Sequence, residues 1–163
     1  MKKATNKKDA LLLLGCPELP VQTSIALYLA NRLTNAGMEV FIAGTDAALE
    51  LLKVSDPDGH YVDVEKIIKL DKCIESLAEK RMDFYLCSVF VHNDAGIAYL
   101  ATVHGISKAK LFAIIFGSDA DSISEQIEFK CGKLVAKAVH NPLPLKRKID
   151  ATMKEVKRWA VSN

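Results

Sequence analysis

A cysteine, a glutamate and a histidine stand where two apolar segments end, and these residue types could do chemistry together. Cys16 and Glu18 lie in GCPELP, directly after ALLLL, and His92 follows FYLCSVFV. A helix N-terminus favours the thiolate form of a nearby cysteine because the helix dipole is positive there. A carboxylate or an imidazole beside a thiol can accept its proton. The three residues are therefore candidate catalytic residues, with Cys16 as the nucleophile.

A second set of residues could bind a ligand, because they follow apolar segments or open the helices that come next. Gln22, Thr23 and Ser24 stand where the backbone amides of a helix start are free to bind an anion. The other candidates are Asp46, Asn93, Asp94, Gly96, Gly117, His140 and Asn141. Cys16, Glu18, His92 and His140 are too dispersed to indicate zinc, so we expect no metal. The cofactor stays unknown at this stage.

The triplet Val-His-Asn occurs twice, in VHND at 91–94 and in VHNP at 139–142. Asn93 or Asp94 can be the N-cap of the following helix without any chemistry. Pro142 and Pro144 can likewise end one element and begin another. Both readings stay open: the two triplets are either parts of a site or two similar ways to leave a strand.

The elements that must position these residues alternate along the chain. Apolar segments near residues 10–15, 38–43, 83–91 and 109–116 predict the central strands, and VEKIIKL and KLVAKAV predict weaker ones. Helical patterns separate them, with Thr45 or Asp46, Asp71, and Ser118 or Asp119 as expected N-caps. Strands that are apolar on both faces and alternate with helices indicate an α/β fold. We expect a three-layer α/β/α sandwich with a mainly parallel sheet of five to six strands.

Length and composition favour one globular domain over residues 1–163, with a flexible start at 1–9 and a C-terminal helix at 143–163. Lysine and arginine total 22 against 20 acidic residues, a balance that indicates neither nucleic-acid nor membrane binding. No apolar segment approaches the roughly 20 residues of a membrane helix. Four scattered cysteines favour the reducing cytoplasm.

Two familiar phosphate-binding motifs are missing. The first loop lacks G-x-G-x-x-G, and no G-x-x-x-x-G-K-[ST] occurs. The sequence therefore supports neither a dinucleotide fingerprint nor a P-loop as the basis of the function.

Five segments together carry a resemblance to a known family. They are GCPELPVQTSIALYLANRL, AGTDAALELL, DPDGHYVD, FVHNDAGIAYLAT and AVHNPLPLKRKID. The chain resembles an uncharacterised archaeal family, found mainly in methanogens and known as a domain of unknown function. The resemblance implies a three-layer α/β/α fold, loosely similar in architecture to DsrE/DsrF-type proteins, and it implies no activity.

Three functions follow from these observations and stay open. The first is a cytoplasmic protein that binds a small molecule or cofactor at the carboxyl ends of its parallel strands. The second is a thiol-dependent enzyme or sulfur carrier that uses Cys16. The third is a structural or assembly subunit without a site. The apolar surface around DFYLCSVF also leads us to expect a homo-oligomer, most simply a dimer.

Overall fold

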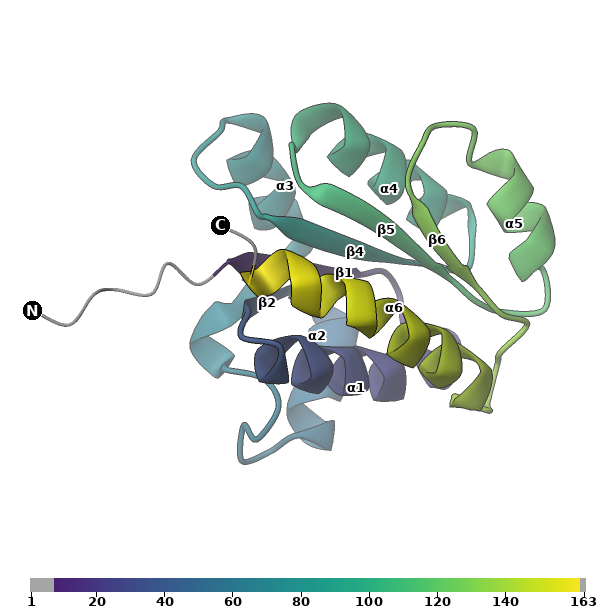
Figure 1. Cartoon of the computed structure of the whole chain (residues 1–163), viewed down its shortest axis with the longest axis horizontal. Coiled ribbons are helices and arrows are strands. Elements are labelled where there is room, and N and C mark those ends of the chain that lie inside the picture. Colours follow the sequence, from purple (N-terminus) through teal and green to yellow (C-terminus); the bar gives the residue numbers. More distant parts are fainter. Residues whose placement is uncertain (1–7, 162–163) are drawn as a thin grey trace, which may run out of the picture.

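The computed structural model describes residues 8–161, with side chains up to residue 158. Six strands and six α-helices alternate along the chain (Figure 1). They are β1 (Asp9–Leu14), α1 (Val21–Asn35), β2 (Glu39–Gly44), α2 (Asp46–Ser55), the 3-10 helix η1 (Val64–Lys66), β3 (Ile67–Lys69), α3 (Leu70–Ala78), β4 (Leu86–Val91), α4 (Asp94–Ile106), β5 (Lys110–Ile115), α5 (Ala120–Gln126), β6 (Gly132–Val135) and α6 (Leu143–Val161).

All six strands form one parallel sheet in the order β3-β2-β1-β4-β5-β6. The four central strands are those that the sequence predicts at the centre. The chain first winds outward from β1 to β3, returns to place β4 beside β1, and then winds outward to β6. This order makes a doubly wound sheet, in which helices must cover both faces.

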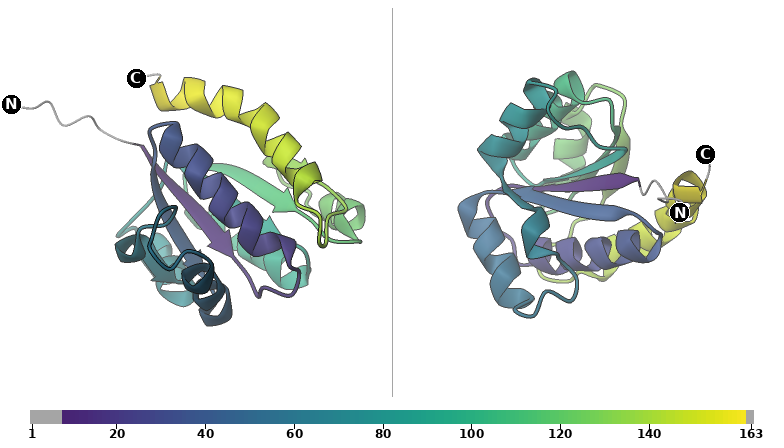
Figure 2. Two further views of the ribbon diagram at one scale, coloured as in Figure 1. Left: turned by 90° about the horizontal axis from the view of Figure 1, so that it is seen from below. Right: turned by 90° about the vertical axis from the view of Figure 1, so that its left-hand side faces the viewer.

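Helices cover each face of the sheet and complete three layers (Figure 2). One core lies between the sheet and α1, α2 and α6, and the other between the sheet and α3, α4 and α5. The predicted three-layer α/β/α sandwich is confirmed. Among the residues predicted to be buried, Leu86, Val89, Ile114 and Ile115 are buried. Phe41 is only half-buried, because just the short β3 lies beyond β2 in the sheet. The rings of Phe41 and Phe84 pack edge to face, with their centroids 5.5 Å apart.

Several predicted boundaries change. Asp9 opens β1, so it is not part of a flexible start, and residues 1–7 lie outside the described residues. Thr45 caps α2 as predicted, since its side chain accepts a hydrogen bond from the Ala48 amide. The cap predicted at Asp71 is wrong, because β3 runs directly into α3 and the N-cap is Lys69. Asp119 is the N-cap of α5, but its side chain makes no capping hydrogen bond.

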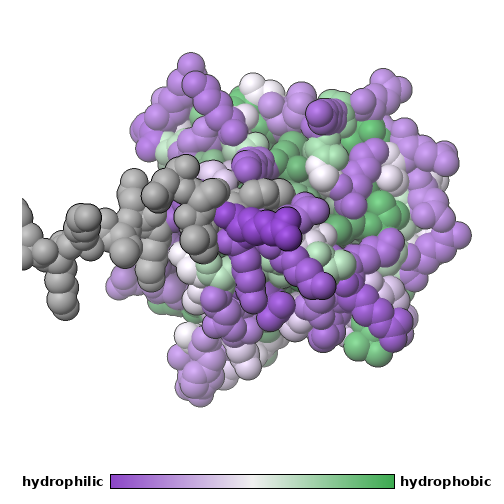
Figure 3. Space-filling view, in the orientation of Figure 1, coloured by the Kyte–Doolittle hydropathy of each residue, from purple (hydrophilic) through white to green (hydrophobic). Residues whose placement is uncertain are grey.

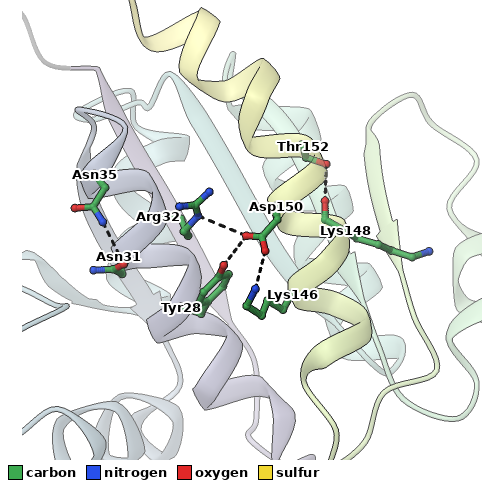
Figure 4. Close-up of polar contacts among 8 residues, drawn as sticks. All are labelled: Tyr28, Asn31, Arg32, Asn35, Lys146, Lys148, Asp150 and Thr152. Atoms are coloured by element: carbon green, nitrogen blue, oxygen red, sulfur yellow. Dashed lines mark hydrogen bonds and ion pairs between the residues drawn. The ribbon is translucent and has the colours of Figure 1, made fainter.

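An ion-pair cluster joins α1 to α6 across their packed faces (Figure 4). Tyr28 donates a hydrogen bond to Asp150 Oδ1, and Lys146 Nζ lies 2.8 Å from Asp150 Oδ2. Arg32 Nε approaches the same carboxylate at 3.5 Å. The hydrogen bonds from Lys146 and then Tyr28 hold the pKa of Asp150 below its usual value. Lys146, the first of three consecutive basic residues at 146–148, is thus engaged within the protein.

The strand that suggested an oligomer, β4, is buried along its whole length by the chain's own helices. Apolar side chains instead gather beside α6, over β5 and β6 (Figure 3). Phe112 and Leu134 are half-buried there. The homo-oligomer stays a prediction, which light scattering at micromolar concentration decides.

Gly96 lets α4 lie directly on the end of β4, and this contact yields a prediction. A Cβ at Gly96 would lie 3.0 Å from Val91 Cα and 3.3 Å from the Phe90 carbonyl oxygen, while a Cβ at Gly105 in the same helix would meet nothing within 4 Å. We expect Gly96→Ala to lower the free energy of unfolding by about 1–2 kcal/mol through overpacking. Gly105→Ala should raise it by up to about 1 kcal/mol through helix propensity. Urea unfolding measures both, and a shift of the same sign in both variants would contradict this account.

Asp56 yields a second prediction because it organises the loop after α2. Its buried carboxylate accepts hydrogen bonds from the amides of His60 (2.8 Å), Tyr61 (2.9 Å) and Val62 (3.0 Å). Burial raises the pKa of Asp56, but these hydrogen bonds together outweigh burial, and the net pKa lies below its usual value. Asp56→Asn should lower the free energy of unfolding by about 2 kcal/mol at neutral pH.

The depressed pKa sets the sign of the pH dependence. The carboxylate contributes stability above its unfolded pKa of about 3.9, and this contribution is lost as the pH falls through the lower folded pKa. Wild-type protein should therefore lose more stability than Asp56→Asn between pH 6 and pH 3. Equal losses in denaturant unfolding at the two pH values would contradict the role of the ionised carboxylate.

Candidate functional site

The strand order reverses between β1 and β4, and this point marks where a ligand is expected. β1 and β4 are direct neighbours, with Leu13 opposite Val89. Their carboxyl ends lead into loop 15–20 and into residues 92–93, which therefore emerge side by side. In open parallel sheets, ligands bind outside the carboxyl ends of the strands at such a reversal.

Glu18 and His92 contact each other at the carboxyl ends of β1 and β4. Glu18 Oε2 lies 3.3 Å from His92 Nε2, and the His92 side chain is only 4% exposed. The His92 ring lies against the ring of Phe116, with their centroids 5.1 Å apart. Asn93 Nδ2 lies 3.5 Å from the same imidazole nitrogen. The structure thus brings two of the three candidate catalytic residues into direct contact.

Cys16, the third candidate, is exposed on the same loop. The hollows described below are lined by neither Cys16 nor His92. The catalytic assignment of Cys16, Glu18 and His92 therefore stays a prediction. Cys73 and Cys87 are 0% and 1% exposed, and burial raises the pKa of both thiols, that of Cys73 to about 11.

These differences predict the order in which the thiols react. Iodoacetamide should alkylate Cys16 of the native protein first, because the thiolate is the reactive form and only an accessible one reacts. Cys73 and Cys87 should react only after unfolding. Mass spectrometry of digested protein measures each site, with Cys16→Ser as the control that removes the fast reaction. Labelling of Cys73 or Cys87 in native protein at the rate of Cys16 would contradict the described burial.

The start of α1 is not the open anion pocket that the sequence suggests. The amide of Val21 donates to the carbonyl of Val139 (3.1 Å), and the amide of Gln22 donates to that of Leu19 (3.2 Å). The buried Gln22 side chain donates to the Gly15 carbonyl at 3.0 Å, while its Oε1 has no partner. Two of the expected free amides are therefore used within the protein.

The other residues expected at the start of α1 differ in exposure. Ser24 is exposed and its hydroxyl donates to the Val21 carbonyl at 3.1 Å. Thr23 is half-buried. These contacts give no ligand-binding role to Ser24 or Thr23.

The two Val-His-Asn triplets start the helices that follow them. Asn93 is the N-cap of α4, with its Oδ1 accepting from the Gly96 amide at 3.0 Å. Asn141 Oδ1 accepts from the Leu143 amide, the first residue of α6, at 3.1 Å. Gly96, expected to admit a ligand, instead admits the backbone of β4. The asparagines thus have a structural role.

The remaining loop candidates are at the same edge of the sheet. Asp94 and His140 are exposed. Gly117 has a φ of 101°, which favours glycine, and its amide donates to the Ala138 carbonyl at 2.9 Å. A Cβ at Gly117 would lie 3.1 Å from Leu19 Cδ1, so this turn packs against the loop after β1.

A hollow of about 660 Å³ opens next to the reversal, at the carboxyl ends of β2 and β3, and we call it the carboxyl-edge hollow. Gly44 and Lys69, the last residues of the two strands, form its floor, and α3 and α4 form its walls. Tyr99 of α4 lines it, and the same ring approaches Gly15 of the loop after β1. Of the thirteen candidates, Asp46 is the one that lines this hollow.

The lining of the carboxyl-edge hollow is acidic. Asp46, Asp71 and Glu75 contribute carboxylates, and Lys69 is the one cation of its lining. Lys69 Nζ already lies 3.4 Å from Asp46 Oδ1. Lys72 pairs with Glu75 at 3.2 Å from outside the lining. Thr45 and Thr102 add hydroxyl groups.

Sequence reasoning missed Lys69, Tyr99 and Thr102 as members of this hollow. Thr102 and Tyr99 sit inside a helix pattern, where their spacing indicates only a helix face. The position of Lys69 at the end of a predicted strand could have indicated that it lines the hollow, since the ends of parallel strands meet at one edge of the sheet.

Two classes of site are not found in the described part of the chain. No three histidine, cysteine or acidic side chains between residues 8 and 158 are grouped as metal ligands would be. No helix within residues 8–161 is long and apolar enough to cross a membrane.

Fold and site together define a doubly wound α/β protein whose candidate site lies at the carboxyl edge of a parallel sheet, beside the reversal of strand order. The chain belongs to the family described as "Domain of unknown function (DUF1890)", whose model matches residues 11–152. The expected membership of an uncharacterised archaeal family is confirmed.

Two relatives match nearly the whole chain. "Uncharacterized protein MJ0452" of Methanocaldococcus jannaschii is 33% identical over 143 residues, which cover 86% of this chain and 94% of the relative. The solved structure of MT0777 is 41% identical, has a TM-score of 0.83, and covers 90% of this chain and 97% of its own. A ribokinase-like superfamily protein (EF1790) of Enterococcus faecalis V583 has 12% identity, a TM-score of 0.50 and coverage of 80% and 45%, so it is alike in fold alone.

Proposed function

We propose that the protein binds a small, ring-containing ligand that carries several hydroxyl groups and no phosphate, in the carboxyl-edge hollow. A nucleoside is the chemistry that fits best. The observation that carries this proposal is an acidic hollow of about 660 Å³ beside the reversal of strand order. This volume lies within the range of about 300–1,000 Å³ that is usual for small-molecule sites.

The lining supports the hydroxyl groups of the ligand. Carboxylates accept hydrogen bonds and donate none, so Asp46 and Asp71 suit vicinal hydroxyls. Asp46 follows the carboxyl end of β2, the strand next to β1, where an acidic residue suits a ribose. The hydroxyls of Thr45 and Thr102 can donate or accept.

Tyr99 supports the ring of the ligand, since an aromatic side chain stacks on a base at low conformational cost. Leu70 and Ile74 add apolar surface to the same hollow. An aromatic ring between apolar and carboxylate groups suits a molecule with one flat face and one hydroxylated face.

Two observations argue against a phosphate on this ligand. The one cation in the lining, Lys69, is paired with Asp46, and the carboxylate of Asp71 would repel an anion. The amides of Val21 and Gln22, which would bind a phosphate at the start of α1, donate to carbonyls of the protein.

Calorimetric titration with adenosine tests the proposal, with adenosine 5′-monophosphate as its phosphorylated counterpart. Adenosine should bind, and the monophosphate should bind at least about tenfold more weakly, a difference of about 1.4 kcal/mol. Asp46→Asn should weaken adenosine binding by a similar factor.

Asp121→Asn is the matched control. Asp121 lies in the first turn of α5, as Asp46 lies in the first turn of α2, and each pairs with a lysine, at 3.3 and 3.4 Å respectively. The control should bind adenosine like the wild type. The absence of adenosine binding, or an equal loss in both variants, would overturn the proposal.

We also propose that the protein works in the cytoplasm. Its four cysteines are free, and free thiols persist in a reducing compartment. Recovery of the native protein with extracellular or membrane fractions would contradict this.

A further inference from the structure

A second hollow of about 610 Å³ lies at the opposite edge of the sheet, and we call it the amino-edge hollow. It is bounded by the last turn of α4, by the segment that leads into β5 and by the first residue of β6. Because α4 runs from the carboxyl edge to the amino edge, it forms a wall of both hollows, with Thr102 in one and Val103 in the other. The two hollows are therefore separate sites on the same face of the sheet.

The charges of the amino-edge hollow are the reverse of those in the carboxyl-edge hollow. Its lining includes Lys108, Lys130 and His104 and no acidic residue. Neither Lys108 Nζ nor Lys130 Nζ forms an ion pair or hydrogen bond with any residue of the described chain. Six other lysines do form ion pairs: Lys53, Lys66, Lys69, Lys72, Lys137 and Lys146. Two lysines whose side chains form no ion pair within the described residues thus line one hollow that has no acidic residue in its lining.

A carboxylate that borders the loop beside this hollow is already engaged. Asp83 accepts hydrogen bonds from the Ser107 hydroxyl, from the amide of Lys108 (3.1 Å) and from the amide of Phe84 (2.9 Å). Its oxygens are directed to the loop between α4 and β5, and it is not part of the lining. Asp83 therefore holds that loop in place. Burial raises the pKa of Asp83, but the hydrogen bonds and the charge of Lys108 together lower it, without a hydrogen bond or ion pair between the Asp83 and Lys108 side chains.

The remaining polar groups of the hollow also suit an anion. The His104 ring stacks on Phe129, with the centroids 4.3 Å apart, so its orientation is fixed. His104 lies in the last turn of α4, where the helix dipole favours a cation. An imidazole N–H and two ammonium groups are donors that bind phosphate oxygens.

We propose that the amino-edge hollow is a second binding site, for the phosphate group of a small molecule, held by Lys108, Lys130 and His104. The volume of the hollow leaves room for an organic portion beside the phosphate. A small molecule fits better than a nucleic acid, because the cations line one bounded hollow and the whole chain carries a net charge of only +2.

The thiol of Cys131 provides a local reporter of this site. Cys131 is half-buried and lines the hollow, while Cys16 is exposed near the opposite edge of the sheet. Pyrophosphate is the probe, compared with sodium chloride at matched ionic strength. Pyrophosphate bound in the hollow should shield the Cys131 thiol, so it should slow the alkylation of Cys131 at least about fivefold and leave the alkylation of Cys16 unchanged. A factor of about 5 corresponds to about 1 kcal/mol.

A pair of double variants tests the lysines. Lys108→Gln with Lys130→Gln should weaken pyrophosphate binding in calorimetry at least about tenfold and abolish the protection of Cys131. Lys148→Gln with Lys154→Gln is the control, since it removes the same charge from the exposed side of α6. The control should retain both the affinity and the protection.

Three outcomes would overturn the proposal. Pyrophosphate could leave Cys131 unprotected, or the two double variants could lose affinity equally, which would indicate unspecific charge attraction. Citrate could protect Cys131 as well as pyrophosphate does, which would make the ligand a polycarboxylate. Because Lys108 and Lys130 do not line the carboxyl-edge hollow, adenosine titration of the same double variant separates a failure here from a failure of the proposed function.

Discussion

The burial of β1 on both of its faces is the constraint on which the rest of the structure depends. Leu11 and Leu13 belong to one core and Leu12 and Leu14 to the other, and each is 0% or 1% exposed. Each buried leucine contributes about 1.5–3 kcal/mol relative to an exposed one. A strand without a polar face needs a helix layer on each side and a neighbouring strand at each edge. β2 and β4 are those neighbours, so the reversal of strand order, and with it the candidate site, lies beside this buried strand.

The elements were predictable because their signals are local. Apolar segments between helical patterns indicated the strands. Thr45 and Asn93 indicated the starts of two helices, because their side chains can accept hydrogen bonds from helix amides. The cap expected at Asp71 failed for a reason that spacing does not reveal. A strand of three residues, Ile67–Lys69, passes into α3 without a loop, so no capping side chain stands between them. Strand order was also beyond local signals, because it depends on which apolar faces meet.

For the candidate site, the sequence predicted only the edge of the sheet at which it lies. Glu18 and His92 are 74 residues apart, and their contact depends on β1 and β4 being neighbours. Gly96 looked like a place for a ligand, yet in three dimensions the strand beneath it takes that space. The charged residues of each hollow likewise come from elements that are distant in the sequence. α4 contributes Tyr99 to the acidic one and His104 to the basic one, and the helical period alone does not separate these roles.

The bond between the Val139 carbonyl and the Val21 amide has a consequence for how the chain folds. α1 has no side chain that caps its start, so a carbonyl from near the other end of the chain completes it. Contacts between distant parts of a chain slow folding, because the loop between them must close before they stabilise anything. We therefore expect α1 to be among the last elements to become fully protected from hydrogen exchange as the chain folds.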